Sequence, residues 1–339
     1  MRMSPSRSVV ALTLLLVATG CRDDETMAGP EPTQAEAMLA GGSWVEKLPL
    51  PSRRIALAAA VVQGPRAVLY AIGGDDDGET LATVEAFDFA TNTWSAKAPL
   101  PARLESTNGA AVIAGKIYVS GGRDLDNHSP GSDDGIPRSS LYVYDPATDT
   151  WSRKADMPLP STDGVSGVIG GRLYVLNPNY DRFYRYDPAA DSWTALASCP
   201  LRHISGAAAV IDGKLYVAGG YARFGVTYPT RKLHVYNPAT NTWEAKAPLP
   251  RGVAGAAGAR LQGRLYVIGG SGPTRSVKLV QAYDPATDTW SAKTPLPSWR
   301  TYLAAASFVN ANGRERIVAA GGYGGTGERW LRSNDVYAP

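Results

Sequence analysis

From residue 44 to the C-terminus the chain repeats one pattern of apolar and polar positions, with a period of about 50 residues. Each unit begins with a run of small apolar residues, then a glycine, then a more strongly apolar run such as LYVAGG. Short apolar runs bounded by turn residues are typical of β-strands, and glycine accepts the positive φ of a tight turn at least cost. Each unit therefore predicts a β-hairpin. The small-residue runs are 56–62, 107–113, 164–169, 205–211, 254–261 and 303–309, and their glycines are Gly64, Gly115, Gly171, Gly213, Gly263 and Gly313.

A second recurring segment completes every unit and is clearest at 283–297, where it reads YDPATDTWSAKTPLP. Asp or Asn at the first turn position can accept a hydrogen bond from the backbone ahead, and proline presets φ at the second. The segment predicts a third strand, a tight turn and a fourth strand headed by tryptophan. Four strands joined in this way form an antiparallel sheet. Copies lie at 87–101, 144–160 and 236–250, a looser copy lies at 186–201, and a half-copy begins at Trp44.

The paired glycines, the tyrosine of the third strand and the tryptophan of the fourth, spaced in this way, resemble the kelch repeat. This resemblance extends from residue 44 to the C-terminus and implies that each unit is one blade of a β-propeller, in which radial repetition protects the sheet edges. The third unit departs from the motif, because it has Asn177-Pro178 in place of the glycines. The glycine pairs are Gly73-Gly74, Gly121-Gly122, Gly219-Gly220, Gly269-Gly270 and Gly321-Gly322, and the tryptophans are Trp94, Trp151, Trp193, Trp243 and Trp290, with Trp44 standing alone.

The two ends of the repeated region are incomplete in complementary ways. Trp44 opens a fourth strand that has no earlier strands of its own, whereas the chain ends on a third strand at 336–339. We therefore expect residues 44–48 to complete the last blade. The predicted fold is all-β, a six-bladed kelch β-propeller closed by pairing of the N-terminal strand with the C-terminal blade.

The N-terminus predicts a targeting segment. Arg2 and Arg7 precede an apolar run at 9–17 that is too short to span a bilayer. The run ends in Ala18-Thr19-Gly20-Cys21, which resembles a bacterial lipobox, although Leu is usual where Ala18 stands. The resemblance implies lipidation of Cys21, with ordinary signal cleavage or an incidental cysteine as the alternatives.

This interpretation divides the chain into a signal peptide at 1–20, a flexible tether at 21–43 and a propeller at 44–339. The tether is expected because 21–43 is rich in Asp, Glu, Pro, Gly and Ala and has little to bury. Arg22 replaces the Asp that retains lipoproteins in an inner membrane. We therefore expect an exported protein of the cell envelope, lipid-anchored to an outer membrane or the cell surface.

Bulk composition limits the possible partners and cofactors. The formal net charge is +3, and loss of Arg2 and Arg7 leaves 32 basic and 31 acidic residues. A nearly neutral chain gives no electrostatic reason to expect nucleic-acid binding. If Cys21 is lipidated, Cys199 has no partner for a disulfide and is interpreted as a packed free thiol. We expect no cofactor.

The variable loops indicate where a ligand binds. Loops between second and third strands lie at the same end of a propeller as the connections between blades, and the longest of them are 123–139, 221–230 and 323–332. Variable loops on one face of a rigid scaffold are the usual place for binding. This loop-rich face is predicted to be lined by arginines that follow the Pro-Leu-Pro segments, with further arginines and aromatic residues from the loops. The candidate binding residues are Arg53, Arg103, Arg202, Arg251 and Arg300, with Arg123, Arg223, Tyr221, Trp299, Tyr302 and Tyr323.

Guanidinium groups around a narrow opening would suit a carboxylate or an acidic peptide. The alternative is that arginine at this position belongs to the repeat and pairs with local carbonyl or carboxylate groups. The expected partner is a protein, a peptide or a carbohydrate.

Metal and catalytic motifs are weak. His128, His203 and His234 share no ligand spacing, so we expect no three-histidine site. The acidic segments, at 75–77 and at Asp124, Asp126, Asp133 and Asp134, match no EF-hand loop and are interpreted as solvated surface. No Gly-x-Ser-x-Gly elbow or P-loop is present.

Two enzyme classes share kelch architecture and provide the alternatives. Copper enzymes similar to galactose oxidase need a Cys cross-linked to a Tyr and two His, which this sequence does not supply together. Sialic acid mutarotase is a six-bladed kelch protein whose chemistry needs a carboxylate beside an arginine. Glu105 near Arg103, or Glu328 near Arg329, could provide that pair. We expect a binding module rather than an enzyme, with a mutarotase-like enzyme or a structural envelope component as the alternatives.

Overall fold

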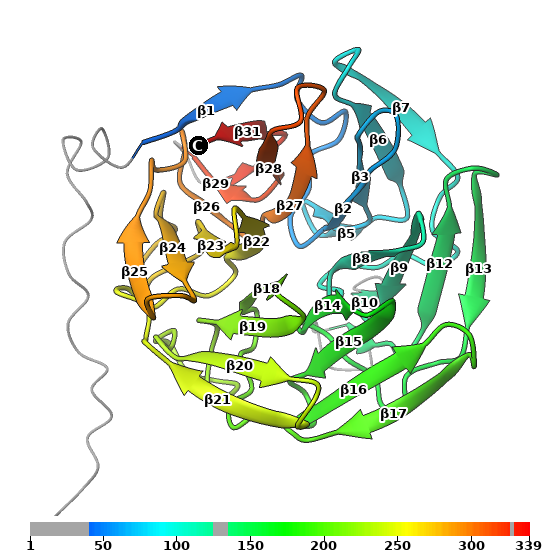
Figure 1. Ribbon diagram of the computed structural model, residues 1–339. Coiled ribbons are helices and arrows are strands. Elements are labelled where there is room, and N and C mark those ends of the chain that lie inside the picture. Colours follow the sequence, from blue (N-terminus) through cyan, green and yellow to red (C-terminus); the bar gives the residue numbers. More distant parts are fainter. Residues whose placement is uncertain (1–40, 125–134, 326–328) are drawn as a thin grey trace, which may run out of the picture.

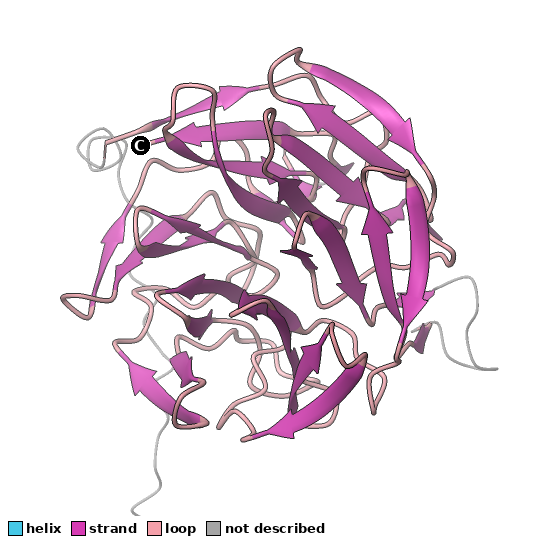
Figure 2. Ribbon diagram, turned by 45° about the vertical axis from the view of Figure 1, so that its right-hand side comes forward, coloured by secondary structure: helices cyan, strands magenta, loops and turns pink. Residues whose placement is uncertain are grey.

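The computed structural model describes residues 41–124, 135–325 and 329–339. The predicted signal peptide, most of the tether and Cys21 lie outside the described residues, as do His128 and Glu328. The described parts consist of strands and loops and contain no helix, and thus no helix that is long and apolar enough to cross a membrane (Figure 2).

Six four-stranded antiparallel sheets, formed within the described residues, are arranged around a central axis (Figure 1). Blades 1 to 5 each use four strands in chain order, from the axis outward. Blade 1 has β2 (Ala58–Val62), β3 (Val68–Ile72), β6 (Val84–Asp88) and β7 (Thr93–Lys97); blade 2 has β8 (Ala110–Ile113), β9 (Lys116–Ser120), β12 (Leu141–Asp145) and β13 (Thr150–Lys154); blade 3 has β14 (Val165–Ile169), β15 (Arg172–Asn177), β16 (Arg182–Asp187) and β17 (Ser192–Leu196). Blade 4 has β18 (Ala207–Ile211), β19 (Lys214–Ala218), β20 (Leu233–Asn237) and β21 (Thr242–Lys246); blade 5 has β22 (Ala257–Leu261), β23 (Arg264–Ile268), β24 (Val280–Asp284) and β25 (Thr289–Ala292).

Blade 6 combines strands from both ends of the chain. Its order is β27 (Ala304–Val309), β28 (Glu315–Ala320), β31 (Asn334–Ala338) and β1 (Ser43–Glu46). The N-terminal strand β1 pairs antiparallel with β31, with Trp44 opposite Tyr337 (Figure 1). Residues 44–48 were expected at this place in the propeller. The remaining described strands form two short pairs and one three-stranded sheet in the loops. The pairs are β4 (Asp75–Asp76) with β5 (Glu79–Thr80) and β10 (Arg123–Asp124) with β11 (Ile136–Pro137); the three-stranded sheet has the order β26 (Arg300–Thr301), β29 (Tyr323–Gly324), β30 (Arg329–Trp330).

The small residues of the innermost strands face a crowded axis. A Cβ atom added to Gly258 on β22 would come within 2.3 Å of the backbone of Ala208 on β18, so only glycine fits there. The larger apolar residues pack between neighbouring blades; Tyr283 and Tyr216, for example, share one apolar cluster across blades 4 and 5. The sequence pattern of small inner and large outer residues therefore corresponds to the taper of the blades.

The hairpin glycines behave as predicted in five units and differ in the first. Gly115, Gly171, Gly213, Gly263 and Gly313 have φ between 70° and 77°. Gly64 does not have a positive φ, and the reason is Pro65, since a proline pushes the preceding residue toward extended conformations. The first blade turns through Gln63 to Ala67, a longer loop than those of blades 2 to 5.

The repeated turn segment joins adjacent blades. In blade 5, Asp284 Oδ1 accepts a hydrogen bond from Ala286 N at 2.9 Å, as the turn chemistry predicted. Asp288 Oδ1 accepts from Tyr283 Oη at 2.6 Å and from Ala247 N at 2.9 Å, and Ala247 lies in the segment after the outer strand of blade 4. The contact between the Tyr283 hydroxyl and Asp288 lowers the pKa of the Asp288 carboxyl below its usual value, because it stabilises the charged form.

Each motif tryptophan also donates its indole Nε1–H to a backbone carbonyl in the segment that follows the outer strand of the preceding blade. A partly buried indole with a satisfied N–H combines a large apolar contact with a directional bond. Trp44 and Trp94 extend the series across the blade formed by the two chain ends. The acceptors are Thr294 for Trp44, Leu48 for Trp94, Ala98 for Trp151, Ala155 for Trp193, Ala197 for Trp243 and Ala247 for Trp290, at 2.8 to 3.0 Å.

Candidate functional site

A closed circle of backbone hydrogen bonds surrounds the axis on the loop-rich face. One residue of each blade, just before its innermost strand, donates its N–H to the carbonyl of the equivalent residue in the preceding blade, at 2.7 to 2.9 Å. All six have positive φ, between 47° and 62°. Five of them are not glycine, which is uncommon in this conformation. We call these residues the mouth: Ala56, Ser106, Asp163, Ser205, Gly255 and Tyr302.

The positive φ at the mouth explains where the inner strands begin. The run 56–62 was expected to be a strand throughout, but β2 begins at Ala58, and β18 likewise begins at Ala207 rather than at residue 205. The residues before these strands turn toward the axis and use their N–H groups in the mouth, so they cannot extend the sheet.

The mouth side chains form a small polar opening of about 100 Å³. Its charged member is Asp163, whose carboxylate oxygens accept hydrogen bonds from Ser205 Oγ and Thr162 Oγ1, both at 3.2 Å. Tyr302 is 36% exposed and stands at φ 51°, where blade 5 has Gly255. The mouth is therefore lined by one carboxylate, hydroxyl groups and an aromatic ring. The prediction of an arginine-lined opening is wrong for this innermost layer.

A second layer places an ion pair beside the mouth. Glu105 precedes Ser106 and forms an isolated β-bridge with Arg123, the first residue of β10. Arg123 Nε donates to Glu105 Oε1 at 2.7 Å, and the glutamate side chain is only 4% exposed. Burial raises the pKa of Glu105, with Arg123 opposing the shift and the carboxylates of Asp75 and Asp163 adding to it. The sequence suggested Arg103 as the partner of Glu105. In the structure the partner is Arg123.

Two predicted residues, Tyr302 and Tyr221, share this region. Burial, followed by the charge of Asp163, raises the pKa of Tyr302 to about 12; Tyr221 and Glu105 add to this shift, and Arg123 opposes it. Tyr221 forms a bridge with Ile204, in the same place in blade 4 as the Glu105–Arg123 bridge in blade 2. Arg123, Tyr221 and Tyr302 thus come from three different blades, and each is a mouth residue or is paired with the neighbour of one.

Three of the predicted arginines, in the connections between blades, pair with carboxylates of the adjacent loops between second and third strands. Arg53 lies 3.0 Å from Asp76, Arg103 lies 2.9 Å from Glu79, and Arg202 lies 2.7 Å from Asp181. These groups are partly exposed, and ion pairs of this kind contribute about 0–1 kcal/mol each. The alternative interpretation, in which the repeat arginines have local partners, applies to these three.

Arg300 cannot bind a ligand on the surface, because its side chain is fully buried and lies 2.7 Å from Asp335. Arg300 follows the same kind of proline-rich segment as Arg53 and Arg251, but the three occupy different positions. Counted back from the mouth residue of its blade, Arg53 is third, Arg300 second and Arg251 fourth. The residue of blade 1 that corresponds to Arg300 is Arg54, also fully buried, with Nη2 2.9 Å from Glu85.

The other predicted residues lie in the loops. The side chain of Arg251 packs against Gly272. The backbone N–H of Arg251 donates to Gln281 Oε1 at 2.9 Å, and Gln281 Nε2 donates to the backbone carbonyl of Arg251 at 3.1 Å. Arg223 is exposed in the loop after β19, and Tyr323 packs edge-on against Trp330. Trp299 lies under the ammonium group of Lys278, 4.9 Å from it.

One acidic segment that was interpreted as solvated surface is in part structural. Asp75 is 3% exposed, and its Oδ1 accepts hydrogen bonds from Trp330 Nε1 at 2.8 Å and from Gly78 N at 3.1 Å. This side chain joins the loop of blade 1 to that of blade 6. Asp124 is half-buried, and Asp126, Asp133 and Asp134 lie outside the described residues.

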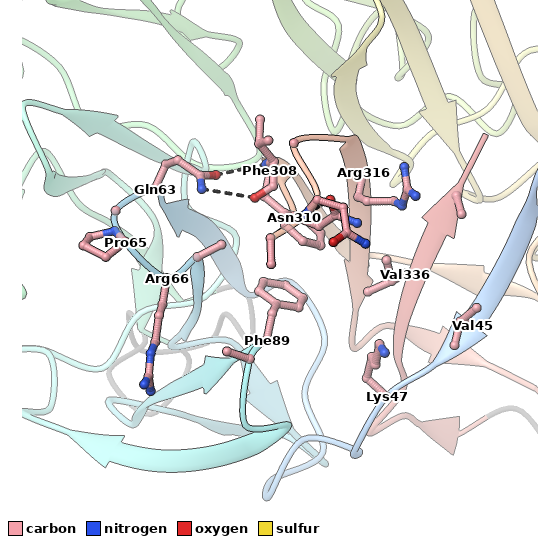
Figure 3. A pocket seen from close by; sticks show the side chains of 18 residues that line it. Val45, Lys47, Gln63, Pro65, Arg66, Phe89, Phe308, Asn310, Arg316 and Val336 are labelled. Atoms are coloured by element: carbon pink, nitrogen blue, oxygen red, sulfur yellow. Dashed lines mark hydrogen bonds between the residues drawn. The ribbon is translucent and has the colours of Figure 1, made fainter.

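The opposite face, which has only short turns, contains a hollow that the sequence did not indicate (Figure 3). It has a volume of about 650 Å³ and opens between blades 1 and 6. Phe89 and Phe308 stack at its base with ring centroids 4.0 Å apart, and Gln63 bonds both backbone groups of Val309 (Figure 3). Phe89 occupies the turn position where the other copies of the motif have proline, and this departure supplies the aromatic floor.

Two histidines also form a contact that no sequence spacing indicates. His203 and His234 were judged to share no ligand spacing, but His203 Nε2 lies 2.8 Å from His234 Nδ1. The two meet without a fixed spacing because His203 precedes β18 and His234 lies on β20 of the same blade.

Comparison with known proteins agrees with this architecture. The Kelch motif model matches residues 58–101, 106–158, 205–250 and 253–297, which together make up more than half of the chain. Two units lie outside these matches: the third, which lacks the paired glycines, and the sixth, whose strands come from both ends of the chain.

Curated relatives match over part of their length. Human Kelch-like protein 35 is 30% identical over 175 residues, which are 41% of this chain and 29% of that protein. Kelch-like protein terF of Aspergillus terreus is 34% identical over 162 residues, which are 44% of this chain and 31% of that protein. The chain thus spans less than a third of the length of these two relatives.

A solved structure, titled "Structure of YjhT", superposes with a TM-score of 0.69 over 85% of this chain and 95% of the other at 16% sequence identity, which supports the fold. The repeat motif, the six four-stranded sheets and the match to the Kelch motif agree, and the chain belongs to the kelch-repeat family.

Proposed function

We propose that the chain is a binding module that holds a protein or peptide partner at the mouth on its loop-rich face. Kelch propellers are typically protein-interaction modules, and the relatives are kelch-repeat proteins. The observation that carries the proposal is the mouth itself, where Asp163 and Tyr302 present a carboxylate and an exposed aromatic ring in strained backbone conformations. Strained residues at a concave surface are commonly retained for function.

The chemistry of the mouth favours a partner that donates hydrogen bonds. Asp163 is an acceptor that Ser205 Oγ and Thr162 Oγ1 already approach as donors, and Asp75 adds negative charge nearby, while the charge of Glu105 is balanced by Arg123. A lysine or arginine side chain entering the opening would meet Asp163, while its aliphatic stem would pack on Tyr302. The acidic ligand suggested by the predicted arginine lining fits this arrangement less well.

The proposal is tested by selecting, from a peptide library, the peptides that bind to the full chain. Asp163→Asn keeps the shape of the side chain and removes its charge, and asparagine tolerates positive φ. We expect this substitution to lower the affinity for selected basic peptides by about 10-fold or more, which is typical of losing a hydrogen bond to a charged group. Tyr302→Ala should weaken them similarly, and fluorescence titration would measure both changes.

Thr194→Ala is the matched control, because Thr194 is exposed on the outermost strand β17. Its affinities should equal those of the unmodified chain. Peptides whose affinity is the same for the unmodified chain, Asp163→Asn and Tyr302→Ala would place the binding surface elsewhere and overturn the proposal.

A mutarotase-like enzyme is the second candidate, and the Glu105–Arg123 pair favours it. A buried carboxyl with a raised pKa is suited to exchange protons near neutral pH, and an adjacent guanidinium can hold a sugar acid. If this function is correct, the unmodified chain accelerates interconversion of sialic acid anomers, and Glu105→Gln lowers the rate about 100-fold or more. NMR exchange measurements would show it. No acceleration by the unmodified chain excludes this candidate and leaves the binding proposal intact.

A further inference from the structure

Three metal-ligating side chains converge inside blade 4. The sequence contains three histidines and two cysteines, and two of these histidines and one cysteine meet here. Cys199, His203 and His234 are all buried, and their ligand atoms lie within 4.8 Å of one another. Among the residues that the structure describes, this is the cluster of His, Cys, Asp and Glu side chains that could hold a metal ion.

The fold itself does not require these residues, because the other blades fill the same positions differently. Cys199, six residues before the mouth residue, replaces an apolar side chain, and His203, two before it, replaces residues of several kinds. His234 lies on the third strand, two residues before the aromatic residue of the motif, Tyr236. The residues that correspond to Cys199 are Leu50, Leu100, Met157, Leu249 and Leu296; those that correspond to His203 are Arg54, Leu104, Ser161, Val253 and Arg300; those that correspond to His234 are Glu85, Tyr142, Tyr184, Gln281 and Asp335.

The equivalent pairs in blades 1 and 6 show that this part of a blade brings polar groups into contact. Arg54 meets Glu85 and Arg300 meets Asp335, just as His203 meets His234. Packing in those two blades is completed by Leu50 and Leu296, both buried, where blade 4 has Cys199. A His, Cys, Asp or Glu side chain occupies all three positions only in blade 4. An exchange of the salt bridge for two histidines would not by itself explain why a thiol stands at the third position.

The hydrogen bonds of His203 orient it as a ligand. Its Nδ1 lies 2.7 Å from Gly219 O, so Nδ1 carries the proton and donates it to this carbonyl. The other nitrogen, Nε2, therefore presents its lone pair toward His234 Nδ1. Metal-binding histidines almost always have a backbone or carboxylate partner of this kind on the second nitrogen. The rings meet nearly edge to face, at 79°.

We propose that Cys199, His203 and His234 form a binding site for one thiophilic transition-metal ion, Zn²⁺ or Cu⁺. Two imidazole nitrogens and one thiolate are a donor set that these ions select. Zinc–nitrogen bonds of about 2.0–2.1 Å in tetrahedral geometry place two nitrogens about 3.3 Å apart. The two rings therefore separate by about half an ångström on binding, which small side-chain rotations provide.

Binding releases protons in a defined way. The Cys199 thiol loses its proton to solvent and binds as thiolate, so one proton leaves per ion. His234 moves its proton from Nδ1 to Nε2 and binds through Nδ1, while His203 keeps Nδ1–H on Gly219 O and binds through Nε2. Cys199 lies between the exposed residues Ser198 and Pro200, so the thiol is close to the surface from which an ion enters.

Metal titration of the full chain tests the site. Co²⁺ added to the reduced protein should give a thiolate charge-transfer band and tetrahedral d–d bands, displaced by Zn²⁺ with a stoichiometry of about one ion per chain. In a parallel anaerobic experiment, Cu⁺ is added in competition with a chelator of known affinity. Tight binding of either Zn²⁺ or Cu⁺ at this stoichiometry supports the site.

Two variants copied from other blades provide the control. Cys199→Leu restores the residue that four other blades have at this position, and His203→Arg with His234→Glu copies the pair of blade 1. Both should fold, as judged by circular dichroism, and lose the charge-transfer band, with affinity for the preferred ion reduced by more than about 100-fold. Cys199→Ser serves if Cys199→Leu does not fold. Failure to bind either ion, or equal binding by Cys199→Leu and the unmodified chain, overturns the proposal and leaves a simple histidine–histidine hydrogen bond.

Discussion

Shortening the chain so that it begins at residue 49 instead of residue 41 should lower the free energy of unfolding by at least about 3 kcal/mol. This truncation removes β1, which pairs with β31 along its whole length. It also removes Trp44, which packs 5.1 Å from the ring of Tyr337 and donates to Thr294 O. Trp94 loses its acceptor, Leu48 O, at the same time. Blade 6 would then expose β31 as an unprotected edge.

Two single substitutions distinguish the contribution of the Trp44 side chain to stability from that of the pairing of strand β1. Trp44→Ala should cost about 2–3 kcal/mol, since it removes a half-buried aromatic ring and one hydrogen bond. Val45→Ala, on the exposed side of the same strand, should change stability by less than about 0.5 kcal/mol. Urea unfolding followed by tryptophan fluorescence measures all three. Equal midpoints for the chains beginning at 41 and 49 would show that the first strand does not contribute to the stability of the propeller.

Replacing Arg300 by leucine should destabilise the protein by about 3–5 kcal/mol, because Asp335 would be left buried without its partner. The pair is fully desolvated, and burial raises the pKa of Asp335 and lowers that of Arg300 in spite of their attraction. Nε and Nη1 of Arg300 also have no hydrogen-bond partner among the described residues. The free-energy cost of desolvating the two charges therefore offsets much of the stabilisation from their Coulomb attraction.

The double variant Arg300→Leu with Asp335→Tyr should recover most of that loss. It copies blade 2, where Leu104 and Tyr142 are both buried at the corresponding positions. Replacing both members of a buried pair with packed apolar groups is often neutral or stabilising. Arg103→Leu is the control: its partner Glu79 is 65% exposed, so the cost should be below about 1 kcal/mol. A double variant as unstable as Arg300→Leu alone would show that the ion pair itself is needed.

The sequence predicted the blades well because the interactions that make a blade are close together in the chain. Asp284 bonds the amide two residues ahead, and Tyr283 bonds Asp288 five residues ahead, so each copy of the motif can be recognised by itself. The exception at Gly64 has an equally local cause in Pro65. Small residues on the inner strands were likewise predictable, because every blade meets the same crowding at the axis.

The predicted site residues were less accurate, and the reason is a shift of one or two positions. Arg53, Arg251 and Arg300 follow similar proline-rich segments, but they are third, fourth and second before the mouth residue. In alternating strand-like backbone such a shift decides whether a side chain is exposed or buried. A fixed signal was present in the sequence: each mouth residue stands five positions after a proline. These prolines are Pro51, Pro101, Pro158, Pro200, Pro250 and Pro297.

The sequence by itself determined the repeat, the number of blades and the place of the turn segment 283–297 on the short-turn face, because these depend on contacts that recur within each unit. Only the tertiary structure decided which chemical groups meet. Glu105 meets Arg123 across 18 positions, His203 meets His234 across 31, and Asp163 meets Ser205 across 42. These separations depend on loop lengths that differ from blade to blade, so no fixed spacing marks the partners. The motif that is easiest to recognise joins neighbouring blades, and the groups with distinctive chemistry lie where the copies differ.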